Sequence, residues 1–519
     1  MTGRHQTLAE LLHRTARRDP GKRAVVCGDV AWTYSEFDAL CSRLAAGLHA
    51  NGIGKGTHVA VLSRNSHAFA ALRFALARLG AVLVPINFML KAEEVAYVLR
   101  HAGVGTLAVD AGLAELGRAA AGLDTQVTRF IGLPGEASPE PAGGAMLGFA
   151  ALAATQADPP AVELSGSDLA QIVYTSGTES LPKGAMLSHE AVIWQYVSCI
   201  VDGGMSASDL MLHSLPLYHC AQLDVFLGPA VYLGCTNVIT GVPSADNLLP
   251  LLERHRITSF FAPPTVWISL LRSPLFDRTD LSALRKGYYG ASIMPVEVLR
   301  EISRRLPDVR LWNFYGQTEI APLATVLKPE DQQRKPGSAG KPALNVETRV
   351  VDDLMQDVAV GEVGEIVHRS PQLLSGYHHD PERTKAAFED GWFHSGDLAV
   401  VDDEGYISVV DRKKDMIKTG GENVASREVE EAIYGLPQVS EVAVIGLPHP
   451  RWVEAVAAVI VVKQGQSLSE ADVVDFCSRR LAGFKVPKGV VFVEALPKNP
   501  SGKLLKREMR KQLERHFSA

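Results

Sequence analysis

Apolar runs with strand spacing alternate with apolar stripes of helical spacing along most of the chain. Near its start, two apolar runs flank Gly28-Asp29, which predicts a β-hairpin over 24–33. Beyond it, the patterns predict helices over 34–50, with Ser35 as the N-cap, and over 68–79, and strands over 59–62 and 81–84. Strands that alternate with helices indicate parallel sheets covered by helices on both faces. The fold is therefore predicted to be α/β.

Two stretches depart from this alternation. Residues 111–160 are rich in Ala, Gly and Pro, and we expect them to form loosely packed surface structure. Residues 411–415 are five consecutive charges, which are too polar for a core element and indicate a domain boundary. The chain beyond them has its own strands and helices, enough for a small domain. We predict a large N-terminal domain over 1–410 and a small α+β C-terminal domain over 411–519.

Composition and charge exclude several classes of protein. The 519 residues are 46% hydrophobic and 21% charged, as in globular proteins. The net charge of −6 comes without a strongly basic region, which argues against nucleic acid as a partner. The most apolar region, 68–90, contains Arg73 and Arg78, so it predicts a helix and a buried strand and no integral membrane association. Six cysteines without a C-x-x-C pair predict reduced, mostly buried thiols and a cytoplasmic location.

Candidate chemistry is concentrated first in residues 174–184, which read YTSGTESLPKG. Glycines let backbone N–H groups approach an anion, hydroxyls add donors and Lys183 adds a mobile positive charge, so this composition suits a polyphosphate. It is not the common nucleotide P-loop, because no Ser or Thr follows Lys183 as a magnesium ligand. Taken alone, the stretch is also typical of a flexible surface loop rich in turn formers.

Further segments combine aromatic, charged and glycine residues at element ends. They are LPLYHC at 215–220, GAS at 290–292, WNFYGQTE at 312–319, WFHSGD at 392–397 and KNPSGK at 498–503. Each alone has an ordinary structural explanation, such as a core histidine, a strand-end turn or a solvated lysine.

Together, these motifs occur in the order and at the spacing of the adenylate-forming superfamily, which contains acyl-CoA synthetases, luciferases and peptide-synthetase adenylation domains. The chain resembles this family over roughly residues 7–510. It departs from the family at Glu179 and Ser180, where Thr and Gly are usual, and we expect Glu179 to face solvent or a basic neighbour. The resemblance implies a large N-terminal domain of parallel sheets flanked by helices, and a small mobile α+β domain that turns about Lys414.

The resemblance also implies roles for single residues. Lys503 would drive adenylation, Thr318 would touch phosphate, Glu319 would hold Mg²⁺, and His219 would lie between the acyl pocket and the thiol tunnel. The residues expected to bind ATP or AMP are Thr175, Ser176, Gly177, Thr178, Lys183, Gly290, Ala291, Ser292, Asn313, Tyr315, Gly316, Thr318, Asp397, Arg412 and Lys503. The acyl pocket would include His219, Gln222, Gly290 and Ala291, and CoA would contact Gly420, Gly421, Trp452, Phe484 and Lys488.

The activity implied by the resemblance is that of an ATP-dependent acyl-CoA synthetase. Such an enzyme forms acyl-AMP and pyrophosphate from a carboxylic acid and ATP, and then transfers the acyl group to CoA. A medium- or long-chain fatty acid is the favoured substrate, and an aryl or cinnamate-like acid is the alternative. Transfer to a carrier-protein thiol and non-catalytic binding of a nucleotide stay open, as does a homodimer. Val486 stands where some relatives carry arginine, which leaves the affinity for CoA open.

Overall fold

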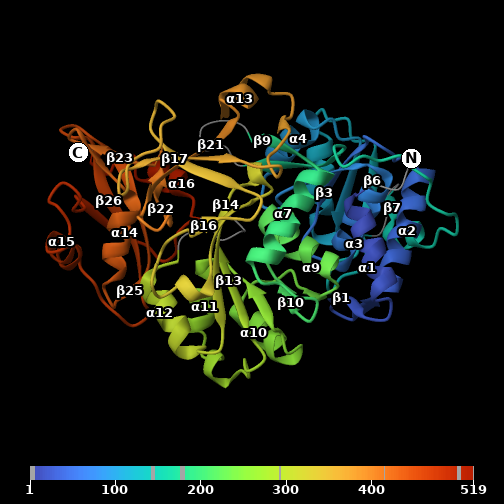
Figure 1. Ribbon diagram of the computed structural model, residues 1–519, viewed down its shortest axis with the longest axis horizontal. Helices are drawn as coiled ribbons and strands as arrows, with labels where there is room; N and C mark the ends of the chain where they lie inside the picture. Colours follow the sequence, from blue (N-terminus) through green and yellow to red (C-terminus); the bar gives the residue numbers. More distant parts are fainter. Residues whose placement is uncertain are drawn as a thin grey trace.

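The computed structural model describes residues 6–141, 146–175, 182–290, 294–413, 415–498 and 504–517. Over these residues the chain forms four β-sheets with helices around them (Figure 1). Three sheets are built from the chain before residue 413, and the fourth from the chain beyond it. No helix in these ranges is long and apolar enough to cross a membrane.

The first large sheet carries the strands on either side of the predicted phosphate loop. Its strands β8, β4, β3, β5, β6 and β7 are parallel, and β9 and β19 join antiparallel at the edge beside β8. In sheet order they are β19 (Gly376–Tyr377), β9 (Lys183–Ser188), β8 (Leu169–Thr175), β4 (Val82–Pro85), β3 (His58–Leu62), β5 (Thr106–Asp110), β6 (Arg129–Leu133) and β7 (Met146–Gly148).

The second large sheet carries the segment with Tyr315. Strands β1, β11, β10, β12, β13 and β14 are parallel, β2 is antiparallel at one edge, and β15 and β16 are antiparallel at the other. In sheet order they are β16 (Lys341–Pro342), β15 (Leu323–Leu327), β14 (Arg310–Gly316), β13 (Lys286–Gly290), β12 (Ser259–Phe261), β10 (Leu210–His213), β11 (Thr236–Ile239), β1 (Arg23–Cys27) and β2 (Val30–Thr33).

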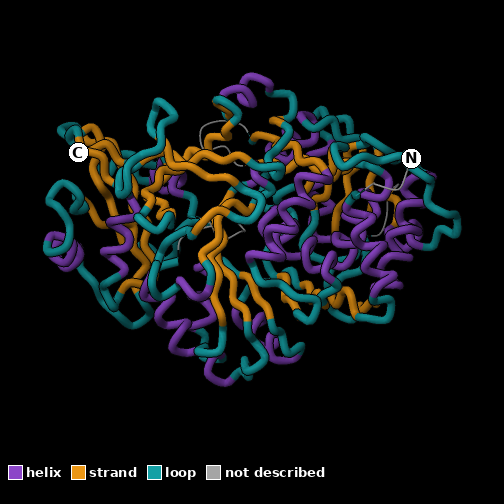
Figure 2. The backbone as a smooth tube through the Cα atoms, in the orientation of Figure 1, coloured by secondary structure: helices purple, strands orange, loops and turns teal. Residues whose placement is uncertain are grey.

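Helices cover both faces of the first sheet, as strand β3 shows residue by residue. Val59 and Val61 pack into one buried cluster with α2 and α3, whereas Ala60 and Leu62 pack into another with α4 and α5. This alternation is the period of two of a strand buried on both sides. The helices of this part of the chain (Figure 2) are α1 (Leu8–Arg18), α2 (Tyr34–Ala50), α3 (His67–Leu79), α4 (Ala92–His101), α5 (Ala114–Ala121), α6 (Phe149–Ala153), α7 (His189–Asp202), α8 (Cys220–Gln222), α9 (Gly228–Leu233), α10 (Ala245–Arg254), α11 (Pro264–Arg272), α12 (Val296–Arg305) and α13 (Pro381–Ala386).

The predicted hairpin over 24–33 is present, but the cap of the helix after it was predicted wrongly. Thr33 caps α2, and its hydroxyl accepts a hydrogen bond from the backbone N–H of Glu36, while the Glu36 carboxylate accepts one from the Thr33 N–H. This reciprocal pair is a capping box, which needs the acidic residue three positions after the cap. Ser35 is part of the first turn of the helix.

Residues 111–160 are better ordered than their composition predicts. Strands β6 and β7 extend the first sheet in parallel, and Ile131, Leu133, Phe149 and Leu152 are buried in the same cluster as α2 and α3. Leu152 of this stretch packs closely against α2, where a Cβ added at Gly47 would lie 2.8 Å from the carbonyl oxygen of Leu152. The expectation of loosely packed surface structure is therefore wrong for this part.

The third and fourth sheets are mainly antiparallel. The third contains β17 (Glu347–Val351), β18 (Gly364–Arg369), β21 (Trp392–Val401), β20 (Phe388–Glu389) and β22 (Ile407–Arg412). The fourth contains β24 (Glu422–Val424), β23 (Ile417–Thr419), β26 (Val453–Val462), β25 (Val439–His449) and β27 (Gly489–Phe492), with helices α14 (Ser426–Tyr434), α15 (Glu470–Ser478) and α16 (Lys506–Gln512). The predicted α/β class, with a small α+β C-terminal part, is confirmed. The boundary at residue 410 stays a prediction.

Candidate active site

Three residues from different segments meet where β14 approaches the third sheet. The Tyr315 hydroxyl donates a hydrogen bond to Asp397 Oδ2 at 2.7 Å, and Arg412 Nε lies 3.4 Å from Asp397 Oδ1. Asp397 on β21 and Arg412 on β22 face each other in the antiparallel register. Burial raises the pKa of Tyr315 well above its usual value, and the nearby Asp397 charge raises it further, so the phenol stays a proton donor. The result is a buried carboxylate between a phenol hydroxyl and a guanidinium.

A second group joins Glu319 to the phosphate-loop strands. Thr318 and Glu319 lie in the short 3₁₀ helix that follows β14, and both are buried. Tyr377 on β19 donates from its hydroxyl to Glu319 Oε1 at 2.9 Å, and Lys183 Nζ lies 5.1 Å from the centre of the Tyr377 ring. Because β19 pairs with β9, this contact fixes Glu319 relative to the strand that begins at Lys183.

Tyr377 was not among the predicted site residues. It stands in the short segment Gly376–Tyr377, far in sequence from both of its partners. The pairing of β19 with β9 and the hydrogen bond from the Leu374 N–H to the Glu319 carbonyl oxygen at 2.8 Å bring it to them. Burial raises the pKa of this phenol and the charge of Glu319 raises it further, which keeps Tyr377 protonated as a donor.

The phosphate loop itself is described only at its two ends. Thr175 and Lys183 are direct neighbours in the antiparallel pairing of β8 and β9, so the loop closes a hairpin. Ser176, Gly177, Thr178 and Glu179 lie outside the described residues. The same holds for Ala291, Ser292, Lys414 and Lys503.

Two predicted glycines sit where backbone approaches backbone. A Cβ added at Gly290 would lie 2.3 Å from the carbonyl oxygen of Phe314, and one added at Gly316 would lie 1.8 Å from that of Pro322. Both positions therefore exclude any side chain. Asn313, one strand position away from this contact, donates from Nδ2 to the Ser338 carbonyl oxygen at 2.8 Å. Its amide nitrogen is thus engaged inside the protein.

The segment after His219 turns its polar residues into the protein. His219 is half-buried and accepts a hydrogen bond at Nδ1 from the Ala221 backbone N–H at 3.1 Å, which caps α8. Cys220 Sγ lies 3.4 Å from Thr318 Oγ1, and burial raises the pKa of the Cys220 thiol to about 12, so it is a neutral packing group beside the predicted phosphate ligand.

Gln222 does not offer its amide to a pocket. Its Oε1 accepts from the Leu215 backbone N–H at 3.1 Å, and its Nε2 donates to His213 Nδ1 at 2.8 Å. The side chain is fully buried. These contacts argue against the predicted place of Gln222 in the acyl pocket and give it a structural role.

The residues predicted to contact CoA lie in the C-terminal part, around Trp452. The Gly420 backbone N–H donates to the Trp452 carbonyl oxygen at 2.9 Å, and Lys488 Nζ lies 5.7 Å from the centre of the indole ring. Gly420 and Gly421 both have positive φ, 60° and 91°, which favours glycine. Phe484, four residues before Lys488, is 38% exposed.

Comparison with known proteins agrees with this arrangement. The AMP-binding enzyme family model matches residues 12–378, and the model of the AMP-binding enzyme C-terminal domain matches residues 428–503. The chain is 37% identical to a feruloyl-CoA synthase of Amycolatopsis sp over 98% of its own length and 99% of the relative. It is also 37% identical to a long-chain-fatty-acid–CoA ligase, FadD13, of Mycobacterium tuberculosis, over 97% of each.

One solved structure matches the whole chain closely. An anthranilate CoA ligase, AuaEII, in complex with anthranoyl-AMP, superposes with a TM-score of 0.91 at 26% identity, covering 99% of this chain and 98% of the other. The matched regions span the Tyr315 segment, the phosphate-loop strands and the C-terminal part. The chain belongs to the AMP-binding enzyme family and is an AMP-forming acyl-CoA ligase, which uses ATP and CoA as substrates.

Proposed function

We propose that this ligase activates an aryl or cinnamate-like carboxylic acid. The observation that carries the proposal is a layer of stacked rings that includes Phe314, the residue that pairs with Gly290. Phe226, in the π-helical turn Leu223–Leu227 after α8, stacks on Phe261 with ring centres 4.3 Å apart and on Phe314 at 5.8 Å. All three are buried.

The ring layer would limit the space open to an acyl chain. Gly290 pairs with Phe314 in the register of β13 and β14, so a group bound between His219 and Gly290 would meet Phe226 and Phe314 directly behind it. A long alkyl chain needs a tunnel through that layer, whereas a flat ring can lie against it. Aromatic rings also favour stacking with another ring, by about 0.5–1.5 kcal/mol beyond the apolar area buried.

Step one would join the acid to the α-phosphorus of ATP and release pyrophosphate. Tyr315 would present its ring to the adenine, and Asp397 would accept hydrogen bonds from the ribose hydroxyls beside Arg412. Lys183, Thr175 and the loop between them would hold the phosphates. Lys503 would approach the α-phosphate and stabilise the negative charge that develops there.

Magnesium fits the donor set at Glu319. Carboxylate oxygens are preferred by this hard cation, and Glu319 is buried and held by Tyr377. A bound Mg²⁺ would neutralise phosphate charge next to Thr318. Within the chain, the Tyr377 hydroxyl holds the Glu319 carboxylate in place, and the Tyr377 ring lies beside Lys183 at the end of the phosphate loop.

Step two would transfer the acyl group to the thiol of CoA and release AMP. We propose that residues 411–519 form a domain that turns about Lys414, removes Lys503 from the site and brings Gly420 and Gly421 to a pantetheine tunnel. Trp452 and Lys488 would contact the nucleotide end of CoA. The proximity of these two side chains supports CoA, rather than a carrier protein, as the acceptor.

A fatty acid is the second candidate. It is favoured by the 37% identity with the long-chain-fatty-acid–CoA ligase, whereas the feruloyl-CoA synthase at the same identity and the anthranilate ligase favour an aromatic acid. The likeness to relatives alone therefore does not separate the two.

A panel of acids separates them. Pyrophosphate release would be measured with cinnamates, benzoates and saturated acids of increasing length, at fixed ATP and CoA. We expect the largest kcat/KM with an aromatic acid. A preference for long saturated acids would refute the proposal.

A variant tests the ring layer itself. Phe226→Ala should open space behind Gly290 and raise kcat/KM for longer acids relative to the preferred one. Phe492→Ala, at a half-exposed ring in β27, is the matched control and should leave the acid preference unchanged. Equal preferences in both variants would mean that the ring layer does not border the acyl site.

A further inference from the structure

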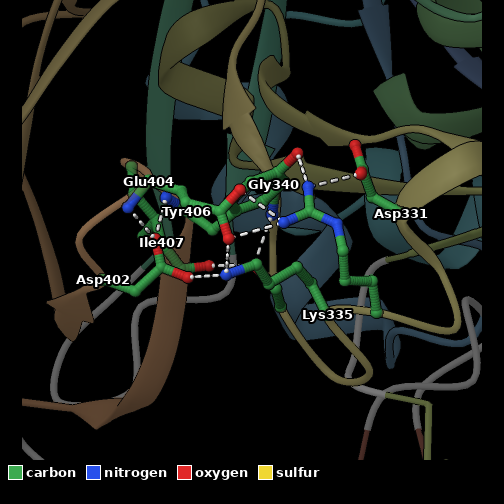
Figure 3. Close-up of polar contacts among 9 residues, drawn as sticks. Asp331, Lys335, Gly340, Asp402, Glu404, Tyr406 and Ile407 are labelled. Carbon is green, nitrogen blue, oxygen red and sulfur yellow. Dashed lines mark hydrogen bonds and ion pairs between the residues drawn. The ribbon is translucent and has the colours of Figure 1, made fainter.

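A segment without a predicted role ties together the two halves of the nucleotide site. Residues 331–341, here called the bridge, run between β15 and β16 and lie against the turn that joins β21 to β22 (Figure 3). The turn residues are 402–406. β14 carries Tyr315 on one side of the bridge, and the hairpin of β21 and β22 carries Asp397 and Arg412 on the other.

The inner part of the bridge is a buried set of hydrogen bonds around Ser338, which is 3% exposed. The Ser338 hydroxyl donates to the Ile407 carbonyl oxygen at 2.7 Å, and its own carbonyl accepts from Asn313 Nδ2 at 2.8 Å. Backbone bonds on both sides complete the link: Ala339 N–H to Ile407 O at 2.8 Å, and Ile407 N–H to Gly340 O at 2.9 Å. One residue thus connects β14 to the first position of β22.

The outer part is a cluster of charges around Tyr406. Lys335 Nζ lies 2.6 Å from Asp402 Oδ2 and 2.6 Å from Glu404 Oε1. Arg334 pairs with Glu404 and Asp331 and also donates to the Tyr406 hydroxyl at 2.9 Å. Both cations, together with Lys341, lie within 5.1 Å of the centre of the Tyr406 ring.

The two parts differ in exposure, and this decides their roles. Exposed ion pairs contribute little to stability, and Arg334 and Glu404 are each 46% exposed. Lys335 is only 17% exposed and holds two carboxylates of the turn at once, so it restricts the turn from one side while Ser338 restricts it from the other. A hairpin held at its turn and at Ile407, the first residue of β22, would transmit that position along both strands to Asp397 and Arg412.

We infer that Ser338 and Lys335 are positioning residues, which set the distance between the ring of Tyr315 and the Asp397 carboxylate and so determine how firmly the enzyme grips the ribose of ATP. The inference rests on the proposed role of Asp397 as the ribose ligand. It goes beyond that role, because it assigns specificity for the sugar to residues that do not touch the nucleotide.

The test compares ATP with 2′,3′-dideoxy-ATP, which lacks both hydroxyls that Asp397 would bind. The readout is kcat/KM for ATP divided by kcat/KM for 2′,3′-dideoxy-ATP, measured by pyrophosphate release with the full-length enzyme. Ser338→Ala and Lys335→Met should each lower this ratio by about 3- to 10-fold through a higher KM for ATP, with kcat changed less than about twofold. Lys335→Arg keeps the charge and should restore most of the ratio.

The matched control is Lys286→Met. Lys286, the first residue of β13, is as buried as Lys335, at 17% exposure. Its Nζ pairs with both carboxylate oxygens of Asp209, away from the proposed nucleotide site. This variant should lower the melting temperature at least as much as Lys335→Met, because it leaves the Asp209 carboxylate, which is only 5% exposed, without its cation, and it should leave the ratio unchanged. A ratio that falls equally in both variants would show general destabilisation and overturn the inference.

Asp397→Asn separates this inference from the proposed function beneath it. If that variant loses discrimination but Ser338→Ala and Lys335→Met keep it, the ribose role stands and the bridge does not set it. If the parent enzyme does not discriminate between the two nucleotides, the ribose role of Asp397 fails, and the inference about the bridge fails with it.

Discussion

Replacing Gln222 tests whether its side chain has a structural role or a role in binding the acid. Its amide lies within a fully buried chain of hydrogen bonds: Leu215 N–H to Oε1, Nε2 to His213 Nδ1, and His213 Nε2 to Asn237 Oδ1 at 2.9 Å. Because the backbone donor fixes which end of the amide is oxygen, it also fixes His213 as the tautomer protonated at Nε2. Asn237 continues the chain to the Ala24 carbonyl oxygen at 2.9 Å.

Replacing this residue by leucine keeps the volume and removes both polar ends. Gln222→Leu leaves the Leu215 N–H and His213 Nδ1 without partners, and each buried unsatisfied group costs about 1–3 kcal/mol, so we expect a loss of about 2–6 kcal/mol. An unfolding entropy of about 2.1 cal/mol/K per residue gives about 0.8 kcal/mol/K for a domain of roughly 400 residues. The melting temperature should therefore fall by about 3–7 °C.

Two measurements on the same preparation distinguish a structural role of Gln222 from a role in the acyl pocket. Calorimetry would give the melting temperature, and pyrophosphate release would give the KM for the acid. We expect a lower melting temperature with the KM for the acid unchanged within about twofold. Gln156→Leu, at an exposed glutamine, is the control and should change neither. A parent-like melting temperature together with a raised KM for the acid would refute the structural role and return Gln222 to the acyl pocket.

Three further outcomes are expected. Lys503→Ala should reduce acyl-AMP formation by orders of magnitude yet spare attack of CoA on supplied acyl-AMP; equal loss of both half-reactions would contradict this division. Lys414→Pro should still release pyrophosphate but nearly stop thioester formation at an unchanged melting temperature, because proline fixes φ at about −65°, and parent rates in both half-reactions would exclude Lys414 as the hinge. Burial lowers the pKa of His213 and His189 to about 4 and that of His368 to about 3. The unfolded state therefore binds more protons below about pH 6.5, and the free energy of unfolding should fall as the pH drops from there towards 4, by about 2 kcal/mol for each histidine at pH 5. Denaturant midpoints that do not change over this range would refute this expectation.

Local patterns predicted the elements well where one period dominates. The hairpin over 24–33, helix α3 and strands β3 and β4 follow from the local apolar pattern alone. The cap at Thr33 could have been found from the Glu36 three residues later, which is a local signal. Residues 111–160 were misjudged because composition does not show that β6 and β7 pair with the edge of a sheet formed by distant strands.

The residues of the candidate site could be predicted only where they belong to a motif of the family. The meeting of Tyr315, Asp397 and Arg412 was expected from the resemblance of their segments to a family, and the structure places them together. Tyr377 and Ser338 carry no comparable motif. Each acts through a contact with a residue more than fifty positions away, Glu319 and Ile407 respectively, and such pairs follow only from the arrangement of the sheets.

The burial of Gln222 has a physical cause in the segment that contains it. An α-helix repeats every 3.6 residues, so Gln222 and Asp224, two positions apart, would point in very different directions. Here α8 passes directly into the π-helical turn Leu223–Leu227, and all five residues of this turn are buried, so the segment has no face exposed to solvent. Both side chains consequently face the interior, and Asp224 pairs with the buried Arg73 at 3.1 Å. Gln222 and Asp224 thus hold this segment in place inside the protein, and we propose the ring of Phe226 as the side chain of this turn that borders the acyl site.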